Sequence, residues 1–327
     1  MMMVRSPFTS LGAVLLSTCM TVCATADDWP MLGRDGTRNS VSSETGAPTN
    51  WIVQQHDRGY AASESRGVLW SVPLGSATYS TPVVSGGLVW IGTNQEAGDG
   101  SILKCFRVSD GAEVYNYESP YLGNREYDTP WGGLGSSPLI EGERLWIATN
   151  RSEVLCLDIG PLVRSQGKPR ELWKLDFVKA FQNYPRVPLM GPPRPCSIGA
   201  SWQDRIFVTI NHGISYGKTK VHNPEAPSLV CLNKDTGAVI WQDNSPGENI
   251  LSSQFSSPTL ATIDGQVQVI VPQSDGWVRA FDPLDGRAFW EFDMNPKTSV
   301  FSIFQSKGKV RRCCVLGNAV VYRDLVY

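Results

Sequence analysis

Cysteine, histidine and aspartate are the residues of this chain whose side chains could act as nucleophiles, metal ligands or general acids. The chain has eight cysteines and three histidines. No Cys-x-x-Cys-His sequence occurs, which excludes covalent attachment of c-type haem. The histidines are His56, His212 and His222, and they lack a metal-ligand spacing such as His-x-x-x-His. The sequence therefore indicates no metal site.

Three aspartates follow a repeated turn pattern. Asp110 and Asp285 directly precede glycine, and Asp235 precedes Thr236 and Gly237. Aspartate in a tight turn commonly accepts hydrogen bonds from backbone N–H groups, so we assign these residues to turns rather than to catalysis or calcium binding. No Gly-x-Ser-x-Gly motif or phosphate-binding loop is present. We nominate no catalytic residue, and the cofactor-binding residues remain unknown.

The elements that must position these residues form an internal repeat. Each unit opens with small residues and then an apolar strand, and three more strands follow, separated by polar turns. The openings are 56, 61 and 59 residues apart, at Pro82, Pro138, Gly199 and Pro258. The fourth strand ends on an aromatic residue such as Trp241. Four short strands per repeat of this length predict the four-stranded blades of a β-propeller.

We therefore predict an all-β fold, a β-propeller with four complete blades and an unfinished fifth. Four matched copies at a near-constant period disfavour the alternative of a β-sandwich. The predicted divisions are a signal peptide over 1–26, an N-terminal extension over 27–65 and the propeller over 66–327, with blades at about 80–118, 136–176, 196–244 and 256–293 and a partial blade at 315–327.

Three cysteines share one position of the repeat. Cys105, Cys156 and Cys231 lie in the third strand of successive units, where Ala280 stands in the fourth. Propeller sheets are covered on both faces, so we expect a small buried core residue here. Equivalent positions on neighbouring blades are too far apart for a disulfide, which needs Cα atoms within about 7 Å. We predict buried free thiols.

Both ends of the chain carry incomplete units. The stretch Gly67–Val72 matches the fourth strand of a blade but has no blade of its own. Such a strand usually completes the last blade and closes the ring. At the other end, 319–327 matches the start of a blade and stops within its second strand. We expect part of a larger propeller: an open arc, or a ring with a defective fifth blade made from both ends.

Specific stretches resemble a known family. Val230–Trp241 resembles the pyrroloquinoline-quinone (PQQ) repeat, in which Thr-Gly precedes a tryptophan by four residues, and Arg279–Trp290 is a second match. Asp28–Pro30 and Gly33–Gly36 resemble the opening of secreted bacterial PQQ-repeat propellers that are similar to the outer-membrane assembly protein BamB. The resemblance extends over 27–327 and is specific for the fold.

The resemblance implies two alternative functions. Quinoprotein dehydrogenases of this family have eight blades and hold PQQ in the central funnel with calcium and a catalytic aspartate. Some have a vicinal disulfide beside the quinone, for which Cys313 and Cys314 are the adjacent cysteines here. BamB-like members bind proteins without a quinone. Because no calcium-ligand set is recognisable, we expect a non-catalytic scaffold without a cofactor. The alternative is a PQQ- and calcium-dependent dehydrogenase of alcohols or sugars.

Three insertions are the candidate binding surface: Tyr117–Gly135, Phe177–Pro195 and Asn211–Ser228. Long loops on a rigid scaffold commonly carry function, and aromatic and arginine side chains are enriched at protein interfaces. The candidate side chains are Tyr121, Arg125, Tyr127, Trp131, Tyr184, Arg186 and Arg194. We expect the insertions to line one rim of the funnel, or alternatively to pack over blade edges. The expected partner is an unidentified protein or polysaccharide of the cell envelope.

The first residues predict export to the periplasm or the cell exterior. Arg5 precedes an apolar stretch, Leu11–Val22, and Ala24–Ala26 forms a cleavage site. The stretch is too short to span a bilayer, so we predict no transmembrane segment. Leu16–Cys19 resembles a lipoprotein signal only loosely, which makes a lipid anchor the weaker alternative. The net charge of −2 disfavours nucleic acid as a partner.

Overall fold

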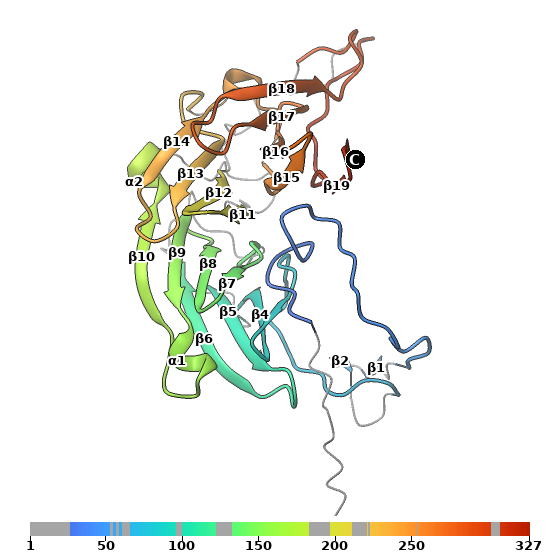
Figure 1. Ribbon diagram of the computed structural model, residues 1–327, viewed down its shortest axis with the longest axis vertical. Coiled ribbons are helices and arrows are strands. Elements are labelled where there is room, and N and C mark those ends of the chain that lie inside the picture. Colours follow the sequence, from blue (N-terminus) through green and yellow to red (C-terminus); the bar gives the residue numbers. More distant parts are fainter. Residues whose placement is uncertain are drawn as a thin grey trace, which may run out of the picture.

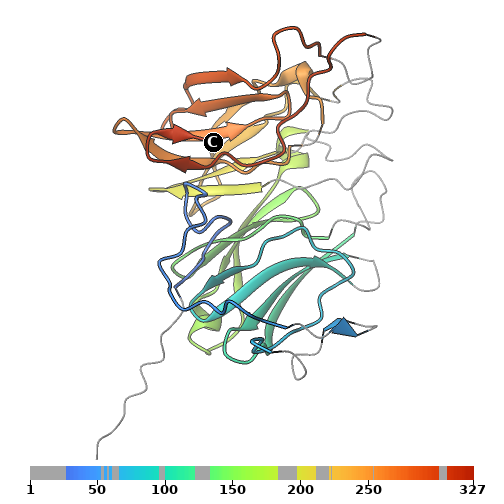
Figure 2. The ribbon, with the colours of Figure 1, turned by 90° about the vertical axis from the view of Figure 1, so that its right-hand side faces the viewer.

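A computed structural model of the chain contains four four-stranded antiparallel sheets and two short hairpins among the residues that it describes. The described residues are 27–52, 55–56, 59–60, 66–95, 100–121, 133–182, 197–210, 221, 223–252, 254–301 and 308–327. The four sheets stack in an arc, with their inner strands toward its concave side (Figures 1 and 2). This architecture confirms the predicted all-β propeller of four-stranded blades.

Each four-stranded sheet is a simple up-and-down meander, in which strands adjacent in sequence are also paired. Blade 1 consists of β3 (Val83–Ser85), β4 (Leu88–Asn94), β5 (Gly100–Arg107) and β6 (Glu113–Pro120). Blade 2 consists of β7 (Leu139–Glu141), β8 (Arg144–Ala148), β9 (Glu153–Asp158) and β10 (Arg170–Asp176).

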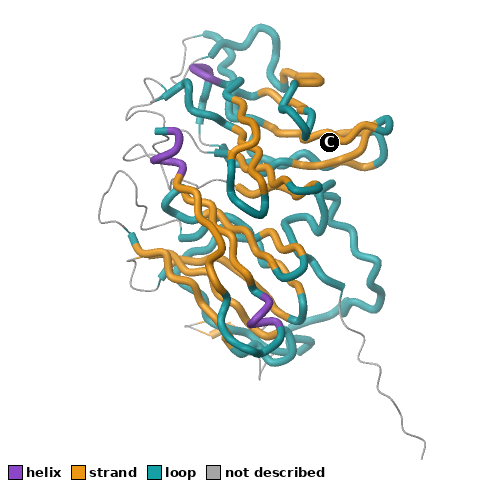
Figure 3. The backbone as a smooth tube through the Cα atoms, turned by 60° about the vertical axis from the view of Figure 1, so that its left-hand side comes forward, coloured by secondary structure: helices purple, strands orange, loops and turns teal. Residues whose placement is uncertain are grey.

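The same order continues in the second half of the arc. Blade 3 consists of β11 (Ser197–Trp202), β12 (Arg205–Thr209), β13 (Leu229–Asn233) and β14 (Val239–Asp243). Blade 4 consists of β15 (Thr259–Ile263), β16 (Gln266–Pro272), β17 (Trp277–Phe281) and β18 (Ala288–Asp293). The remaining elements are short: β1 (Gln55–His56), β2 (Gly59–Tyr60), β19 (Val321–Tyr322), β20 (Leu325–Val326), α1 (Gly160–Val163), α2 (Phe177–Phe181) and the 3-10 turn Gly247–Asn249 (Figure 3).

A β-bulge interrupts the pairing of the third and fourth strands at the same place in each of the four blades. On one side of the bulge a small residue pairs with the aromatic residue of the fourth strand, as Cys231 does with Trp241. The equivalent pairs are Cys105 with Tyr115, Cys156 with Trp173 and Ala280 with Trp290. The extra residue of a bulge re-aims the neighbouring side chain, and the small partner leaves space beside the ring. The three cysteines are buried and free, as predicted.

A tryptophan–glycine contact joins neighbouring blades. The Trp241 ring of blade 3 lies against Gly286, in the turn between β17 and β18 of blade 4, and its indole N–H donates to the Pro283 carbonyl at 3.1 Å. Trp173 of blade 2 makes the same contact with Gly237 of blade 3 and donates to Lys234 at 3.1 Å. Both glycines have positive φ, and a Cβ on either would lie within 2.7 Å of the ring.

Trp70 makes a third copy of this contact, and this corrects one prediction. Gly67–Val72 was expected to form an outer strand, but the segment contains no strand. The sheet of β19 and β20 consists of these two strands alone among the described residues. Instead, the Trp70 ring packs on Gly111 of blade 1 and its indole donates to Val108 at 2.7 Å. The aromatic contact, rather than a backbone ladder, therefore determines where this segment lies.

Residues 29–38, which we call the axial segment, bind the innermost strand of every blade. Trp29 forms a β-bridge with Val84 of β3, and the Pro30 carbonyl accepts from Ile140 of β7. The remaining inner strands are reached farther along the segment: Arg38 donates to Gly199 of β11, Gly36 accepts from Leu260 of β15 and Thr37 accepts from Val321 of β19. One short stretch thus satisfies inner backbone groups that the meanders leave unpaired.

Arg38 is the charged centre of the axial segment. Its guanidinium is buried and donates to the carbonyls of Leu32, Gly199 and Pro258, the last two at 2.5 and 3.1 Å. Desolvation lowers the pKa of Arg38 to about 10, against the opposing effect of Asp35. A planar group with five N–H donors suits three carbonyls that converge from different segments. Arg38 therefore joins the N-terminal stretch to blades 3 and 4.

The tryptophan–glycine contact predicts a large effect of Gly237→Ala. We expect it to lower the free energy of unfolding by about 2–4 kcal/mol, because the methyl group both strains a positive φ and displaces the Trp173 ring. Gly265→Ala is the matched control, since Gly265 also has positive φ but nothing lies within 4 Å of the added Cβ. It should cost about 1 kcal/mol. Equal losses in chemical denaturation would contradict the contact's role.

Arg38→Ala should lower the free energy of unfolding by about 3 kcal/mol, because buried carbonyls lose charge-assisted donors. Arg34→Ala is the control: both residues have positive φ, but the Arg34 side chain is partly exposed. Its loss should stay below about 1 kcal/mol. Urea titrations of the two variants measure the difference. A smaller loss for Arg38→Ala than for Arg34→Ala would show that the axial segment does not support the blades.

Candidate functional site

The insertions predicted as a binding surface begin and end at one end of the strands. In an antiparallel meander, the connection from the second to the third strand lies at the same end as the connection to the next blade. The insertions follow β6, β10 and β12, which are two fourth strands and one second strand. Their described flanking residues therefore lie on one face of the arc, which we call the insertion face. The expectation of a common rim follows from this topology.

The second and third insertions meet at Asn223. The second begins with α2, whose first turn is capped by Asp176: its carboxylate accepts from the Lys179 backbone N–H at 3.1 Å. Asn223, in the third insertion, donates its side-chain amide to the Phe181 carbonyl at 3.3 Å. The buried Phe177 ring anchors α2 in the core between blades 2 and 3. Two chain segments are thus fixed against each other on the insertion face.

Most of the predicted side chains of the insertions lie outside the described residues. Tyr121 is described and is half-buried at the end of β6. The others, Arg125, Tyr127, Trp131, Tyr184, Arg186 and Arg194, are not described, and neither are His212 and His222. Their role in binding stays a prediction.

Two equivalent asparagines on the insertion face have different surroundings. Asn94 is the last residue of β4 and binds the segment before blade 1: its side-chain oxygen accepts from the Ala77 N–H at 2.9 Å and its amide donates to Ser76 at 2.8 Å. Asn150 is the same position of blade 2 and is also buried. Within the described part of the chain, neither polar atom of the Asn150 side chain has a hydrogen-bond partner. Sequence reasoning missed Asn150, because its burial depends on neighbouring blades.

The turn aspartates lie at the opposite end of the strands. Asp110 accepts from the Ala112 N–H at 3.0 Å, and this hydrogen bond, together with Arg107, lowers the pKa of its carboxyl group. Asp285 likewise accepts from Arg287 at 2.9 Å. Asp235 differs, because its carboxylate pairs with Arg144 of blade 2 at 2.6 Å. All three positions have structural partners, in agreement with the turn assignment for Asp110 and Asp285.

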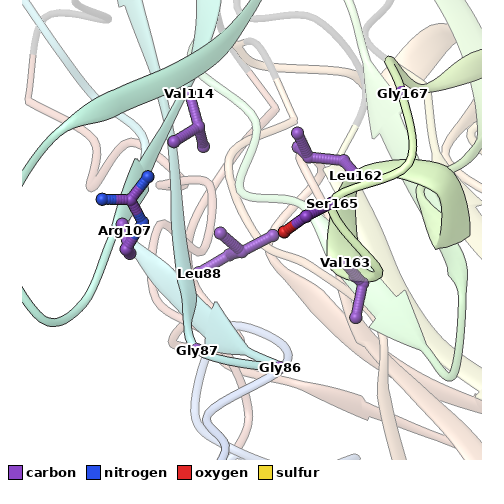
Figure 4. Close-up of a pocket in the computed structure, with 9 residues that line it drawn as sticks. All are labelled: Gly86, Gly87, Leu88, Arg107, Val114, Leu162, Val163, Ser165 and Gly167. Carbon is purple, nitrogen blue, oxygen red and sulfur yellow. The ribbon is translucent and has the colours of Figure 1, made fainter.

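A hollow of about 420 Å³ lies at this opposite end, between blades 1 and 2. Blade 2 has α1 where the other blades have their glycine turn, so the tryptophan–glycine contact is missing at this junction. Leu88 and Arg107 of blade 1 face Leu162 and Ser165 of the α1 loop across the hollow (Figure 4). Arg107 is already paired with Asp110 at 2.5 Å. The hollow therefore offers mainly apolar and backbone surface.

The inner backbone groups of the blades and the Arg38 donors are used within the chain. The inner strands of the blades bind the axial segment, and the Arg38 guanidinium is engaged by three carbonyls. Among the described residues, no three His, Cys, Asp or Glu side chains are grouped as metal ligands.

The adjacent cysteines lie at the end of blade 4 on the insertion face. Cys313 is exposed, Cys314 is half-buried, and neither forms a disulfide in the structure. Asn295 holds the Cys313 backbone with two hydrogen bonds, at 2.8 and 3.0 Å.

No helix among the described residues is long and apolar enough to cross a membrane.

Comparison with known proteins supports the fold. Residues 163–318 match a family model described as outer membrane protein assembly factor BamB. No curated protein matches the sequence. The structure is similar to a quinohemoprotein alcohol dehydrogenase from Comamonas testosteroni, with a TM-score of 0.52, 11% identity, and coverage of 82% of this chain and 41% of the other. At this identity the likeness concerns the fold alone.

Two weaker structural matches extend the comparison. A quinohemoprotein alcohol dehydrogenase from Pseudomonas putida HK5 aligns with a TM-score of 0.48 and 12% identity, covering 83% of this chain and 48% of the other. BamB from Moraxella catarrhalis aligns with a TM-score of 0.42 and 17% identity, covering 79% and 71%. The chain thus spans less than half the length of either alcohol dehydrogenase.

The five described cysteines should differ strongly in thiol reactivity. Burial raises the pKa of Cys156 and Cys231 to about 12 and that of Cys105 further. At pH 8 a thiol with a pKa of about 12 is ionised in about one molecule in 10⁴, and only the thiolate is nucleophilic. Maleimide labelling with peptide mapping should therefore modify Cys313 in the native protein, and Cys105, Cys156 and Cys231 only after unfolding. Native labelling of Cys156 as fast as that of Cys313 would contradict the buried register.

Proposed function

We propose that this β-propeller of PQQ-type repeats, similar to the outer membrane protein assembly factor BamB, is a non-catalytic scaffold that holds a protein partner in the cell envelope. The observation that carries the proposal is the common placement of the three insertions. Their described ends lie on one face of a stack of blades held rigid by aromatic contacts and the axial segment. Rigid sheets that present several loops on one side are suited to recognition.

The same residues weigh against the alternative of a quinoprotein dehydrogenase. That activity requires a pocket near the funnel axis in which a quinone and a calcium ion are held together. Residues 29–38 bind the inner strands of the described blades through backbone hydrogen bonds. The donor groups there are used by the protein's own backbone. A scaffold function needs no such pocket, so it agrees with the use of these groups within the chain.

We further propose that the partner is met in the periplasm or outside the cell. The predicted leader supports export, and the description of the matching family model names the outer membrane. The net charge of −2 bears on the class of partner. The chain has no excess of basic residues for an anionic polymer, which disfavours nucleic acid. A polysaccharide partner is the second possibility, because aromatic side chains of the insertions can also stack on sugar rings.

Partner capture tests the scaffold function through the insertions. The purified protein is cross-linked in an envelope extract, and captured proteins are quantified by mass spectrometry. Trp131→Ala and Arg186→Ala should each reduce capture of the main partner at least tenfold. Leu284→Ala is the control, because Leu284 is exposed in the turn between β17 and β18 at the other end of the strands. Capture unchanged by both insertion variants, or no partner at all, would contradict the proposal.

A reconstitution experiment tests the alternative directly. The protein is incubated with PQQ and calcium, and quinone absorbance and dye reduction with alcohols or sugars are measured after gel filtration. We expect no retained quinone and no turnover. Stoichiometric binding with turnover would overturn the scaffold function in favour of the dehydrogenase.

A further inference from the structure

The turn between β8 and β9 contains a buried side chain whose hydrogen-bonding groups are unused. Asn150 is only 3% exposed, and within the described part of the chain neither its Oδ1 nor its Nδ2 has a partner. Most buried polar side chains are paired, because an unpaired buried carboxamide lowers the stability of the folded state. Blade 2 lies between two other four-stranded blades, whereas the incomplete unit of β19 and β20 lies beside blade 4 (Figure 1).

Blade 1 shows what a side chain at this position binds. Asn94 and Asn150 each lie four residues after the buried tryptophan of the second strand that pairs with the cysteine of the third. Asn94 Oδ1 accepts from the Ala77 N–H at 2.9 Å, and the Asn94 backbone N–H donates to the Ala77 carbonyl at 3.2 Å. Its Nδ2 donates to the Ser76 hydroxyl at 2.8 Å. In blade 1 the position therefore binds a peptide segment.

A glycine lets this segment approach closely. A Cβ on Gly75 would collide with the carbonyl oxygen and with Oδ1 of Asn94. The Gly75 N–H donates to Thr93 Oγ1 at 3.0 Å, and this hydroxyl donates to the Ala77 carbonyl at 3.2 Å. Thr93 and Asn94 thus hold Gly75–Ala77 together, and the first residue of the segment has to be glycine.

Blade 4 uses the position in the same way. Ser274 lies four residues after Ile270, the counterpart of the blade 1 tryptophan. Its backbone N–H donates to Gln254 Oε1 at 3.0 Å, and its carbonyl accepts from the Leu251 N–H at 3.0 Å. Two blades hold a segment of the chain here. Blade 2 has the side chain for such a contact without a bound segment among the described residues.

The charged groups next to Asn150 are already paired. Arg151 lies 3.5 Å from one carboxylate oxygen of Glu153, and the other oxygen accepts from the Thr149 hydroxyl at 3.2 Å. Thr149 is the counterpart of Thr93, and its hydroxyl is therefore used within its own turn. The group left over is a neutral carboxamide with one acceptor and one donor, which suits a peptide better than an ion.

We propose that Asn150 binds a peptide segment of the protein partner, as Asn94 binds Gly75–Ala77. The β8–β9 turn connects a second and a third strand, so it lies at the same end of the strands as the insertion face. The peptide and the insertions then meet the partner from one side. The inference rests on the proposed scaffold function and adds the chemistry that the partner presents, which is a glycine-containing stretch of backbone.

Thermal stability tests whether Asn150 is unpaired in the free protein. Asn150→Leu replaces the carboxamide with an apolar side chain of similar size, so it should raise the melting temperature. Asn94→Leu is the matched control and should lower it, because Ser76 and Ala77 lose their partner. A lower melting temperature for both variants would show that Asn150 is paired by a water molecule or by the chain itself, and would overturn the inference.

A synthetic peptide with the sequence of Val72–Ser80 is the binding probe, because it contains the segment that Asn94 holds. In protein with isotope-labelled asparagine, the side-chain amide signal of Asn150 is assigned by its absence from Asn150→Leu. Titration with the peptide should shift this signal, and Asn150→Leu should weaken peptide binding about tenfold or more. The same peptide with Gly75→Ala should not bind, because its Cβ would collide with the turn.

An amide signal that stays unchanged at saturating peptide would overturn the inference. So would peptide binding that Asn150→Leu leaves unchanged, because the peptide would then bind elsewhere.

Partner capture separates this inference from the scaffold function. Asn150→Leu should reduce capture from an envelope extract about tenfold, with Leu284→Ala again as the control. Capture that Asn150→Leu leaves unchanged but Trp131→Ala abolishes would contradict the peptide site and leave the scaffold function standing. If no variant captures a partner but the peptide titration succeeds, the scaffold function fails and the peptide site remains.

Discussion

Both faces of a propeller blade are largely apolar and must be buried, so each blade depends on the next one for the burial of its outer strand. The tryptophan–glycine contact is the form that this dependence takes here. A large ring on the fourth strand needs a neighbour without a side chain, and a turn with positive φ supplies both a glycine and a carbonyl acceptor. The bulge beside the ring and the small Cys or Ala opposite it are consequences of the same requirement.

The places where this contact is missing are the places where the surface is hollow. Blade 2 replaces its glycine turn with α1, and a hollow opens toward blade 1. In blade 4 the Trp290 indole donates to Gln268 of its own blade, and an apolar groove lies beside its ring. Trp70 shows the reverse case: a segment without strand pairing is held on blade 1 because it carries the aromatic side chain that the blade 1 turn requires. The aromatic contact with the blade 1 turn therefore accounts for the position of this segment, which its strand-like sequence pattern does not.

The axial segment adds a second constraint, which bears on function. Inner strands at the axis have backbone groups that their own blades leave unpaired, and residues 29–38 satisfy groups in all four blades and in β19. The hydrogen-bonding groups of the inner strands are thus paired within the chain at these positions. The insertion face is the surface on which the described ends of the three insertions lie.

The period and register of the blades could be read from the sequence, because strand alternation, turn residues and the small residue at Cys105, Cys156 and Cys231 are local signals. The common face of the insertions also follows from strand order. Other features depended on the tertiary structure, because they join residues far apart in the chain: Arg38 on Gly199 and Pro258, Trp70 on Gly111, and the buried Asn150. The predicted strand at Gly67–Val72 was wrong for the same reason. Its apolar pattern is that of a strand, but a strand forms only where another strand offers an edge.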